Sequence, residues 1–232
     1  MCIRDSFRAE GDRFGEADTL YSLSMSSTLG GELERGEHLA DQARRMFEEL
    51  GSREKIGQVY MAQAALMHAG GRHSEARPYW ETALGIAREL GDRQLAVTEL
   101  MGIGIVDFHE GKLADALRVT VEALDEATDL ENVQVAVWLL HYVGVFSASV
   151  LPEEAVQIDG AVHALRQESG GGMGHDAMGL EDTRIAASRT LDADRLRDAW
   201  SKGRMMTLAE AIDLARRIER QIHDDSLFSG TR

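Results

Sequence analysis

Large and small residues return along this chain at an interval of 40 residues. A bulky residue, followed four positions later by a small one, recurs in four successive stretches of the sequence. The bulky residues are Leu20, Tyr60, Leu100 and Leu140. The small residues are Ser24, Ala64, Gly104 and Gly144. A spacing of four places both on one face of an α-helix, and such a period is typical of stacked helical units that bury their apolar faces against one another.

Glycines divide each 40-residue unit into two predicted helices. In the second unit these are 53–69 and 74–90. Gly70-Gly71 lies between the two helices, and Gly91-Asp92 follows the second. We place the helix ends there because glycine is favoured where a helix ends and aspartate can cap the next helix. The fourth unit has Glu131 and Leu151-Pro152 in place of the glycines. The pattern predicts antiparallel helix pairs without β-sheet, with breaks near 51, 70–71, 91, 111, 131 and 151.

The second unit also carries the alternation of large and small residues that characterises the tetratricopeptide repeat (TPR). The positions are Tyr60, Ala64, Met67, Ala76, Trp80 and Ala83. The chain therefore resembles TPR proteins over residues 11 to 168. Its helices are longer than those of the standard TPR repeat, which has about 34 residues. Asp107 and Ser147 stand where an aromatic residue is usual. The resemblance implies an all-α fold, a TPR-like right-handed superhelix of antiparallel helix pairs with a 40-residue repeat.

Beyond Glu168 the period fails, and the chain divides into segments of different composition. We assign 1–6 to an artefact, 7–168 to about four TPR-like repeats, 169–177 to a Gly-rich linker, 178–222 to a C-terminal helical cap and 223–232 to a disordered tail. Helices of the cap are expected near 180–188, 193–202 and 208–222. Thr207 and Glu210 have the spacing of a capping box at the start of the last one.

The segment 191–217 is similar to the closing segment of large bacterial signalling regulators. The residues that carry the similarity are Ala199-Trp200, Gly203-Arg204 and Thr207-Leu208-Ala209-Glu210-Ala211. These regulators, the LuxR/MalT-like ATP-dependent proteins and the nucleotide cyclase fusions, join a signalling domain to a TPR-like region. The resemblance implies that this chain is the C-terminal regulatory part of such a multidomain bacterial transcriptional or signalling regulator.

Residues 1–6, Met-Cys-Ile-Arg-Asp-Ser, match an in-frame translation of the mosaic-end adapter used in transposase-based sequencing libraries. We interpret them as an artefact of cloning or assembly and leave them out of the fold. A genuine start codon is the alternative. On the first interpretation the native chain begins upstream, and Cys2, the single cysteine, supports no disulfide or thiol chemistry.

The charge and the motif content exclude several classes of function. A net charge of −15, without a basic patch, argues against nucleic acid and anionic membranes as direct partners. The sequence shows neither a signal peptide nor an apolar run near the ~20 residues of a membrane span, so we expect a cytoplasmic protein. No phosphate-binding loop and no metal-binding histidine spacing occurs. Gly102 and Gly104 fall inside a predicted helix, where packing explains them. We expect no cofactor, no metal and no catalysis.

The position one residue after the bulky row predicts a binding groove, since the equivalent row lines the concave surface of TPR proteins. Methionine adapts its shape to varied partners, so the row is suited to a peptide or a small effector. Core packing is the alternative for this row, and ordinary half-exposed helix positions are the alternative for the histidines. The candidate groove residues are Tyr21, Met61, His68, Met101, Phe108, His109, Trp138 and His141. Trp80, in contrast, is expected in the core.

These observations predict a non-catalytic helical-repeat module that binds a protein, a peptide or a small effector in its concave groove. The regulatory part of a multidomain regulator is the first hypothesis, and a stand-alone TPR adaptor is the alternative. An enzyme on a helical scaffold is the remotest one, because no acid–base or metal constellation is evident.

Overall fold

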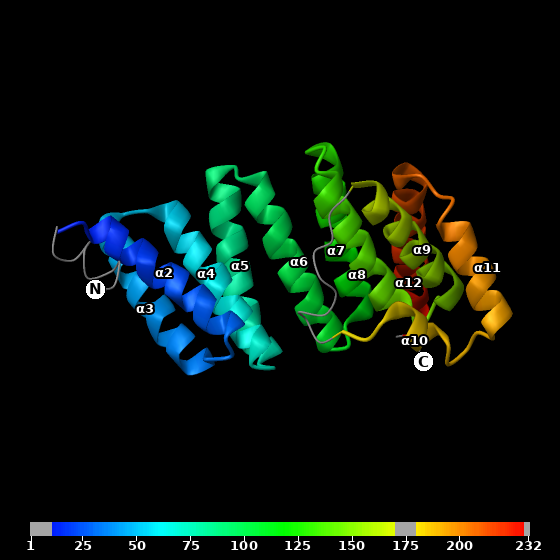
Figure 1. The fold of residues 1–232 in the computed structure, drawn as a ribbon, viewed down its shortest axis with the longest axis horizontal. Helices are drawn as coiled ribbons and strands as arrows, with labels where there is room; N and C mark the ends of the chain where they lie inside the picture. Colours follow the sequence, from blue (N-terminus) through cyan, green and yellow to red (C-terminus); the bar gives the residue numbers. More distant parts are fainter. Residues whose placement is uncertain (1–10, 170–179, 230–232) are drawn as a thin grey trace. The chain divides into compact units, whose positions relative to one another are not determined.

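The computed structural model describes residues 11–169 and 180–229, and these residues are entirely helical apart from turns (Figure 1). They form eleven helices in consecutive antiparallel pairs. The predicted all-α architecture is therefore confirmed for the described residues, while the handedness of the superhelix stays a prediction. The expected artefact at 1–6 lies outside the described residues, as does the predicted linker apart from Ser169, the last residue of a helix.

The chain divides into two compact units, Met1–Val106 and Asp107–Arg232, which we describe separately. The helices of the first unit are α2 (Arg13–Leu29), α3 (Leu33–Leu50), α4 (Arg53–Ala69), α5 (His73–Leu90) and α6 (Arg93–His109) up to Val106. In this unit α2 pairs with α3 and α4 with α5, and α4 packs against both α2 and α3. The first helices of the first two repeats are therefore neighbours, as a stacked array requires.

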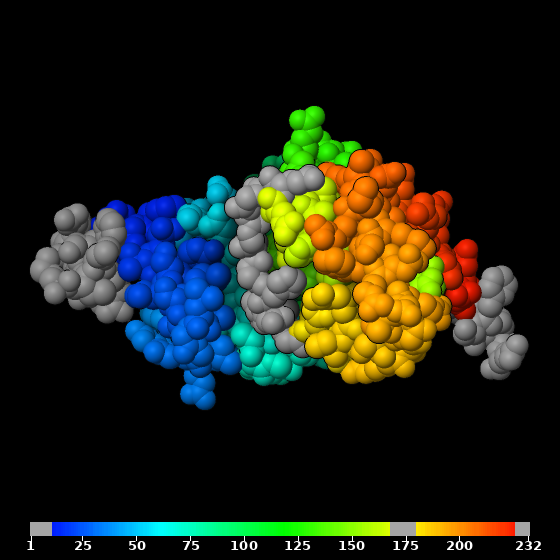
Figure 2. Space-filling model, turned by 45° about the vertical axis from the view of Figure 1, so that its right-hand side comes forward, coloured from blue at the N-terminus to red at the C-terminus, as the bar shows by residue number. Residues whose placement is uncertain are grey.

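The second unit contains the last helix pair of the repeats and the C-terminal helices. Its helices are α7 (Leu113–Asp129), α8 (Val133–Ser147), α9 (Pro152–Ser169), α10 (Thr183–Ala187), α11 (Ala193–Gly203) and α12 (Leu208–Ser229). Helix α8 packs against α7 and α9, and α12 contacts α7, α8 and α9. Figure 2 shows α10 and α11, in gold and orange, beside α9, in yellow-green.

The predicted helix ends agree closely with the observed ones in the repeats. Helix α4 has the predicted limits, and α5 begins one residue before its predicted start. Side chains cap the helices as expected: the carboxylate of Asp92 accepts a hydrogen bond from the backbone N–H of Leu95 at 2.9 Å. Glu210 likewise accepts one from the backbone N–H of Thr207 at 2.8 Å, which confirms the capping box.

The C-terminal end differs from its prediction. Helix α12 continues to Ser229, so residues 223–229, expected to be a disordered tail, are helical. The physical reason is local: no glycine or proline occurs between the capping box and Ser229, and nothing in that stretch stops a well-capped helix. Helix α10 is also shorter than the predicted 180–188 and covers only five residues.

The turns between helices depend on a left-handed residue at a fixed position. The residues with positive φ among those described are Gly11, Gly31, Gly51, Gly71, Gly91, Gly111 and Glu131. Glu131 stands at the glycine position of the fourth repeat and keeps its conformation, with a φ of 55°. A side chain in this region costs roughly 1–2 kcal/mol, so the repeat geometry is retained there at a local cost.

The small residues allow helices of the first unit to approach closely. Ser24 and Ala64 are fully buried. A Cβ atom at Gly102, on α6, would lie 2.5 Å from two ring carbons of Trp80 on α5. Trp80 is itself buried, as predicted for a core residue. Gly102 is therefore explained by packing, as the sequence indicated, because the indole ring occupies the space of a side chain.

An ion pair repeats with the same period as the core. Arg13, at the start of α2, pairs with Glu49 near the end of α3, and Arg53 pairs with Glu89 in the same way one repeat later, at 2.5 Å. All four side chains are more than half exposed, so each pair contributes little to stability. The recurrence shows that the 40-residue period extends from the core to the surface of the first unit.

Helix α9 of the last repeat and the C-terminal helix α11 touch through their backbones. A Cβ atom at Gly160 would lie 2.4 Å from the carbonyl oxygen of Trp200, and one at Gly203 would lie 1.9 Å from the carbonyl oxygen of Gln157. Both positions therefore require glycine in this structure. Gly203 belongs to the segment 191–217, and the close contact gives that residue a structural reason.

Candidate functional site

Three of the predicted groove residues lie on successive first helices of the first unit. Tyr21 comes from α2, Met61 from α4 and Met101 from α6, each directly after a bulky residue of the core row. Tyr21 and Met61 are half-buried, whereas Leu20 and Leu100 are buried. Met101 is only 6% exposed. The row therefore offers two partly exposed apolar side chains, and its third member is covered.

Tyr21 lies in a polar and aromatic environment on α2. The Nζ atom of Lys55, on α4, is 5.8 Å from the centroid of the Tyr21 ring and 2.5 Å from Oδ1 of Asp18. It also lies 6.0 Å from the ring of Phe14. Burial, with smaller effects from the Asp18 and Glu99 carboxylates, raises the pKa of the Tyr21 phenol. The phenol is therefore a neutral hydrogen-bond donor beside an ion pair, suited to an amphipathic partner.

Glu99 is a buried carboxyl group that the sequence analysis missed. Its side chain on α6 is fully buried, and neither oxygen accepts a hydrogen bond from the described residues. Burial raises its pKa to about 8, so the group is mostly protonated at neutral pH. Val59 and Leu139 occupy the same position of neighbouring repeats, and both are fully buried. An acidic residue between the apolar Val59 and Leu139 of the neighbouring repeats was the signal available in the sequence.

His68 is not open to solvent as a groove residue would be. Its side chain is 8% exposed, and its Nδ1 lies 2.9 Å from Nδ1 of His73 across the turn between α4 and α5. The centroids of the two rings are 4.6 Å apart. The sequence analysis placed His68 on the concave surface, while in the structure the residue contacts the second helix of its own pair.

In the second unit, the candidate residues flank a chain of aromatic rings. The ring of Phe108 stacks on that of Phe146 with the ring centroids 4.5 Å apart, and the centroids of the Tyr142 and Phe146 rings are 5.8 Å apart. The ring centroids of Trp138 and His141 lie 5.9 and 5.7 Å from the ring centroid of Tyr142. The sequence analysis missed Tyr142 and Phe146, which are buried and connect the predicted residues.

The exposure of these residues varies. Trp138, His141 and Phe108 are half-buried, and His109 is exposed and lies 6.1 Å from Phe108. Burial raises the pKa of Tyr142 to about 12, and the nearby Arg166 guanidinium opposes the rise. The tyrosine is therefore a neutral core residue rather than a proton donor for chemistry near pH 7.

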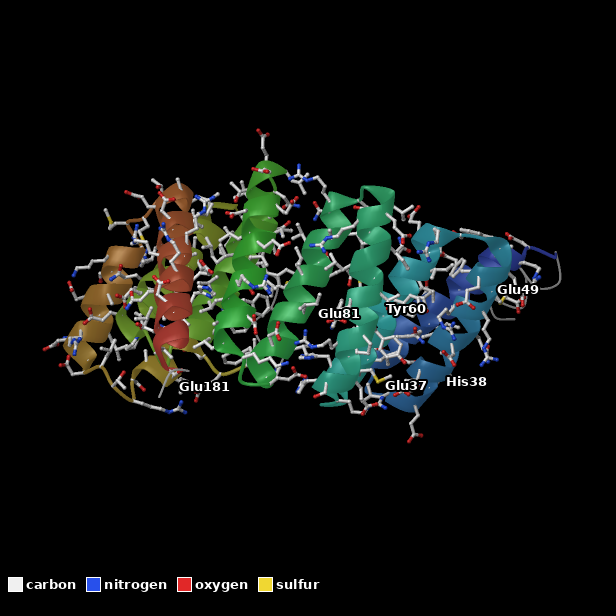
Figure 3. The ribbon with its side chains drawn as sticks, turned by 180° about the vertical axis from the view of Figure 1, so that it is seen from behind. Glu37, His38, Glu49, Tyr60, Glu81 and Glu181 are labelled. Atoms are coloured by element: carbon white, nitrogen blue, oxygen red, sulfur yellow. The ribbon has the colours of Figure 1, made fainter. Side chains whose placement is uncertain are left out.

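A hollow of about 650 Å³ in the first unit lies beside the turns of the first two helix pairs. It is lined by Gly31, Glu32, Leu33, Glu34, Arg35, Glu37, Gly70 and Arg72. Arg35 pairs with Glu32 at 2.6 Å, and Arg72 pairs with Glu37, a residue labelled in Figure 3. Because both arginines are already paired with carboxylates and Glu34 adds a third acidic side chain, the hollow presents an acidic surface instead of an anion site.

None of the described helices is long and apolar enough to span a membrane.

No family model matches the sequence, and the comparison with curated proteins gives no match. Among solved structures, the crystal structure of BtubC (BKLC) from P. vanneervenii is similar, with a TM-score of 0.63 and 20% identical residues. The alignment covers 94% of this chain and 85% of that chain. The described chain therefore has an all-α fold of consecutive antiparallel helix pairs that resembles the TPR-like fold of BtubC.

Proposed function

We propose that this chain is a non-catalytic helical-repeat module that binds a segment of a protein partner along the Tyr21–Met61 row of its first unit. The observation that carries the proposal is the half-exposure of two large apolar side chains at equivalent positions of the neighbouring helices α2 and α4. Leu20, which precedes Tyr21, is buried in the core, and Tyr60, which precedes Met61, is half-buried and packs against the same core. Repeated apolar positions of this kind suit an amphipathic helix or an extended segment.

The charge of the chain specifies the chemistry of the partner segment. A net charge of −15 favours a segment with lysine and arginine beside its apolar anchors. The Asp18–Lys55 pair next to Tyr21 offers both signs of charge at one end of the row. We therefore expect association to slow as added salt screens the attraction.

The wider context of the module is part of the same proposal. The similarity of the segment 191–217 to bacterial regulators supports the regulatory part of a multidomain protein, and a stand-alone adaptor is the alternative. The sequence of the intact gene distinguishes the two. An upstream ATPase or cyclase domain supports the regulator, and a gene that encodes only helical repeats supports the adaptor.

A photo-crosslinking amino acid at position 61 tests the binding surface and identifies the partner segment. The same amino acid at Met205, which is 84% exposed and lies in the second unit, is the matched control. The segment captured only from position 61 is then synthesised and titrated against the parent chain, the Tyr21→Ala/Met61→Ala variant and the Met205→Ala variant.

We expect the double variant to lose about tenfold or more in affinity while its circular dichroism is unchanged, and the Met205→Ala variant to bind like the parent. Equal affinity of the double variant and the parent contradicts the proposed surface. A segment without basic residues, whose binding is insensitive to salt, contradicts the proposed chemistry of the partner.

A further inference from the structure

Two histidine rings meet at the inner turn of the second helix pair. His68 is the second-last residue of α4, and His73 is the first residue of α5. Gly70-Gly71 reverses the chain between them, with a φ of 71° at Gly71. The reversal brings the two Nδ1 atoms to 2.9 Å from one another, with the rings inclined at 55°. Residues five apart in the sequence thus face each other because the turn is tight.

The distance between the two nitrogens suits a metal ion. Imidazole nitrogens coordinate transition metals at about 2.0–2.1 Å, and two atoms 2.9 Å apart at that distance subtend about 90° at the ion. This is the angle between neighbouring ligands in octahedral and square-planar sites. A tetrahedral ion requires a wider separation, and calcium or magnesium requires oxygen ligands. The geometry therefore favours Ni²⁺ or Cu²⁺.

Charge and access at the turn also favour a cation. Arg72, directly before His73, pairs with Glu37 and lies 3.8 Å from Glu75. Two carboxylates therefore surround the guanidinium of the residue next to His73. His73 is half-buried, so an ion can reach the pair from solvent, while the burial of His68 limits the hydration of its ring.

We propose that His68 and His73 chelate a single divalent transition-metal ion of the Ni²⁺ or Cu²⁺ type through their Nδ1 atoms. The bound ion ties the end of α4 to the start of α5. It therefore stabilises the second helix pair more as the free ion concentration rises above the Kd of the site, because it binds the folded arrangement and not the unfolded chain. This site is independent of the partner-binding row proposed above, and either can fail alone.

Titration of the full chain with Ni²⁺ tests the site. The protein carries no histidine tag and has Cys2→Ser, so that neither a tag nor the thiol competes for the ion. His73→Asn is the main variant, because an amide retains a polar partner for His68 but is a poor ligand for Ni²⁺. His38→Asn is the matched control, since His38 is an exposed histidine on α3 of the same unit, labelled in Figure 3.

We expect one Ni²⁺ per parent chain, at least a tenfold loss of affinity in His73→Asn, and no change in His38→Asn. In NMR spectra, paramagnetic Ni²⁺ should broaden the ring signals of His68 and His73 before those of the other histidines. Circular dichroism verifies that the variants are folded. Equal affinity of folded His73→Asn and the parent, or broadening that starts at another histidine, overturns the proposal.

Discussion

At the scale of single residues, Glu99 makes the stability of this protein depend on pH. Burial raises the pKa of its carboxyl group from 4.5 to about 8, so the folded chain holds a proton that the unfolded chain releases over this interval. The stabilisation from proton binding is complete below pH 4.5 and is lost as the pH rises to about 8. The free energy of unfolding should therefore fall in this window, by up to about 1.4 kcal/mol per pH unit.

The variant Glu99→Gln should remove this contribution to the pH dependence, because an amide of similar size does not titrate. Urea unfolding of the parent and the variant at a series of pH values gives the difference directly. Glu99→Leu, which restores the apolar character of Val59 and Leu139 at this position, should be more stable than the parent at pH 8. Parallel pH profiles for the parent and Glu99→Gln would contradict the burial of an uncharged carboxyl group.

Glu131 is a second residue whose local conformation has a consequence for stability. Its φ of 55° lies in the left-handed region, where three earlier repeats have Gly11, Gly51 and Gly91. Glu131→Gly should raise the free energy of unfolding by about 1 kcal/mol, because glycine adopts this conformation without steric cost. Urea unfolding measures the change, with Glu131→Ala as the control that keeps a Cβ atom. A stability gain in Glu131→Ala as large as in Glu131→Gly would show that the backbone is not the cause.

At the scale of the elements, helix packing outweighs helix propensity at Gly102. An alanine in a helix interior is favoured over glycine by about 1 kcal/mol, yet a Cβ atom at Gly102 meets three ring carbons of Trp80 at 2.5–2.8 Å. Gly102→Ala should therefore destabilise the protein by roughly 1–3 kcal/mol, as overpacked cores do.

Gly85→Ala is the matched control for this prediction. Gly85 lies in the interior of α5, and no atom outside the nearby backbone of α5 lies within 4 Å of the Cβ position there. This substitution should stabilise the protein by about 1 kcal/mol. Thermal unfolding of the two variants compares them under the same conditions. If both variants gain stability, α5 and α6 do not pack as closely as the structure shows.

Close packing also outweighs helix propensity at the contact between α9 and α11. Gly160 and Gly203 place backbone against backbone, so α9 and α11 approach closely beside the apolar contacts of Val156, Leu196 and Trp200. The segment 191–217 thus contributes to the packing of the second unit. A partner that binds elsewhere on the chain leaves this contact intact.

At the scale of the whole molecule, the pattern of large and small positions specifies the fold more than particular residues do. The chain and BtubC share the arrangement of helix pairs with 20% identical residues. A repeated unit that buries its apolar face against neighbours tolerates such divergence, because volume and period are retained while identities change. The surface is then available for binding, and in this chain it is strongly acidic.

The sequence by itself determined the helical class, the repeat and most helix limits. Helix α4 has its predicted ends, and the turns contain the predicted glycines and Glu131. These features depend on residues near one another in the chain: the spacing of apolar positions, capping side chains and residues that favour a positive φ. The extension of α12 to Ser229 also has a local explanation, because no glycine or proline interrupts residues 208–229.

Only the tertiary structure decided which side chains meet. The covering of Met101, the buried carboxyl group of Glu99 and the contact between His68 and His73 were not evident from the repeat. The same holds for the rings of Tyr142 and Phe146 that connect the candidate residues of the second unit. A period assigns each residue to a face of its helix, but burial and the geometry of contacts depend on the side chains that neighbouring helices bring to that face. Those neighbours are distant in the sequence, and their packing is fixed only when the helices stack.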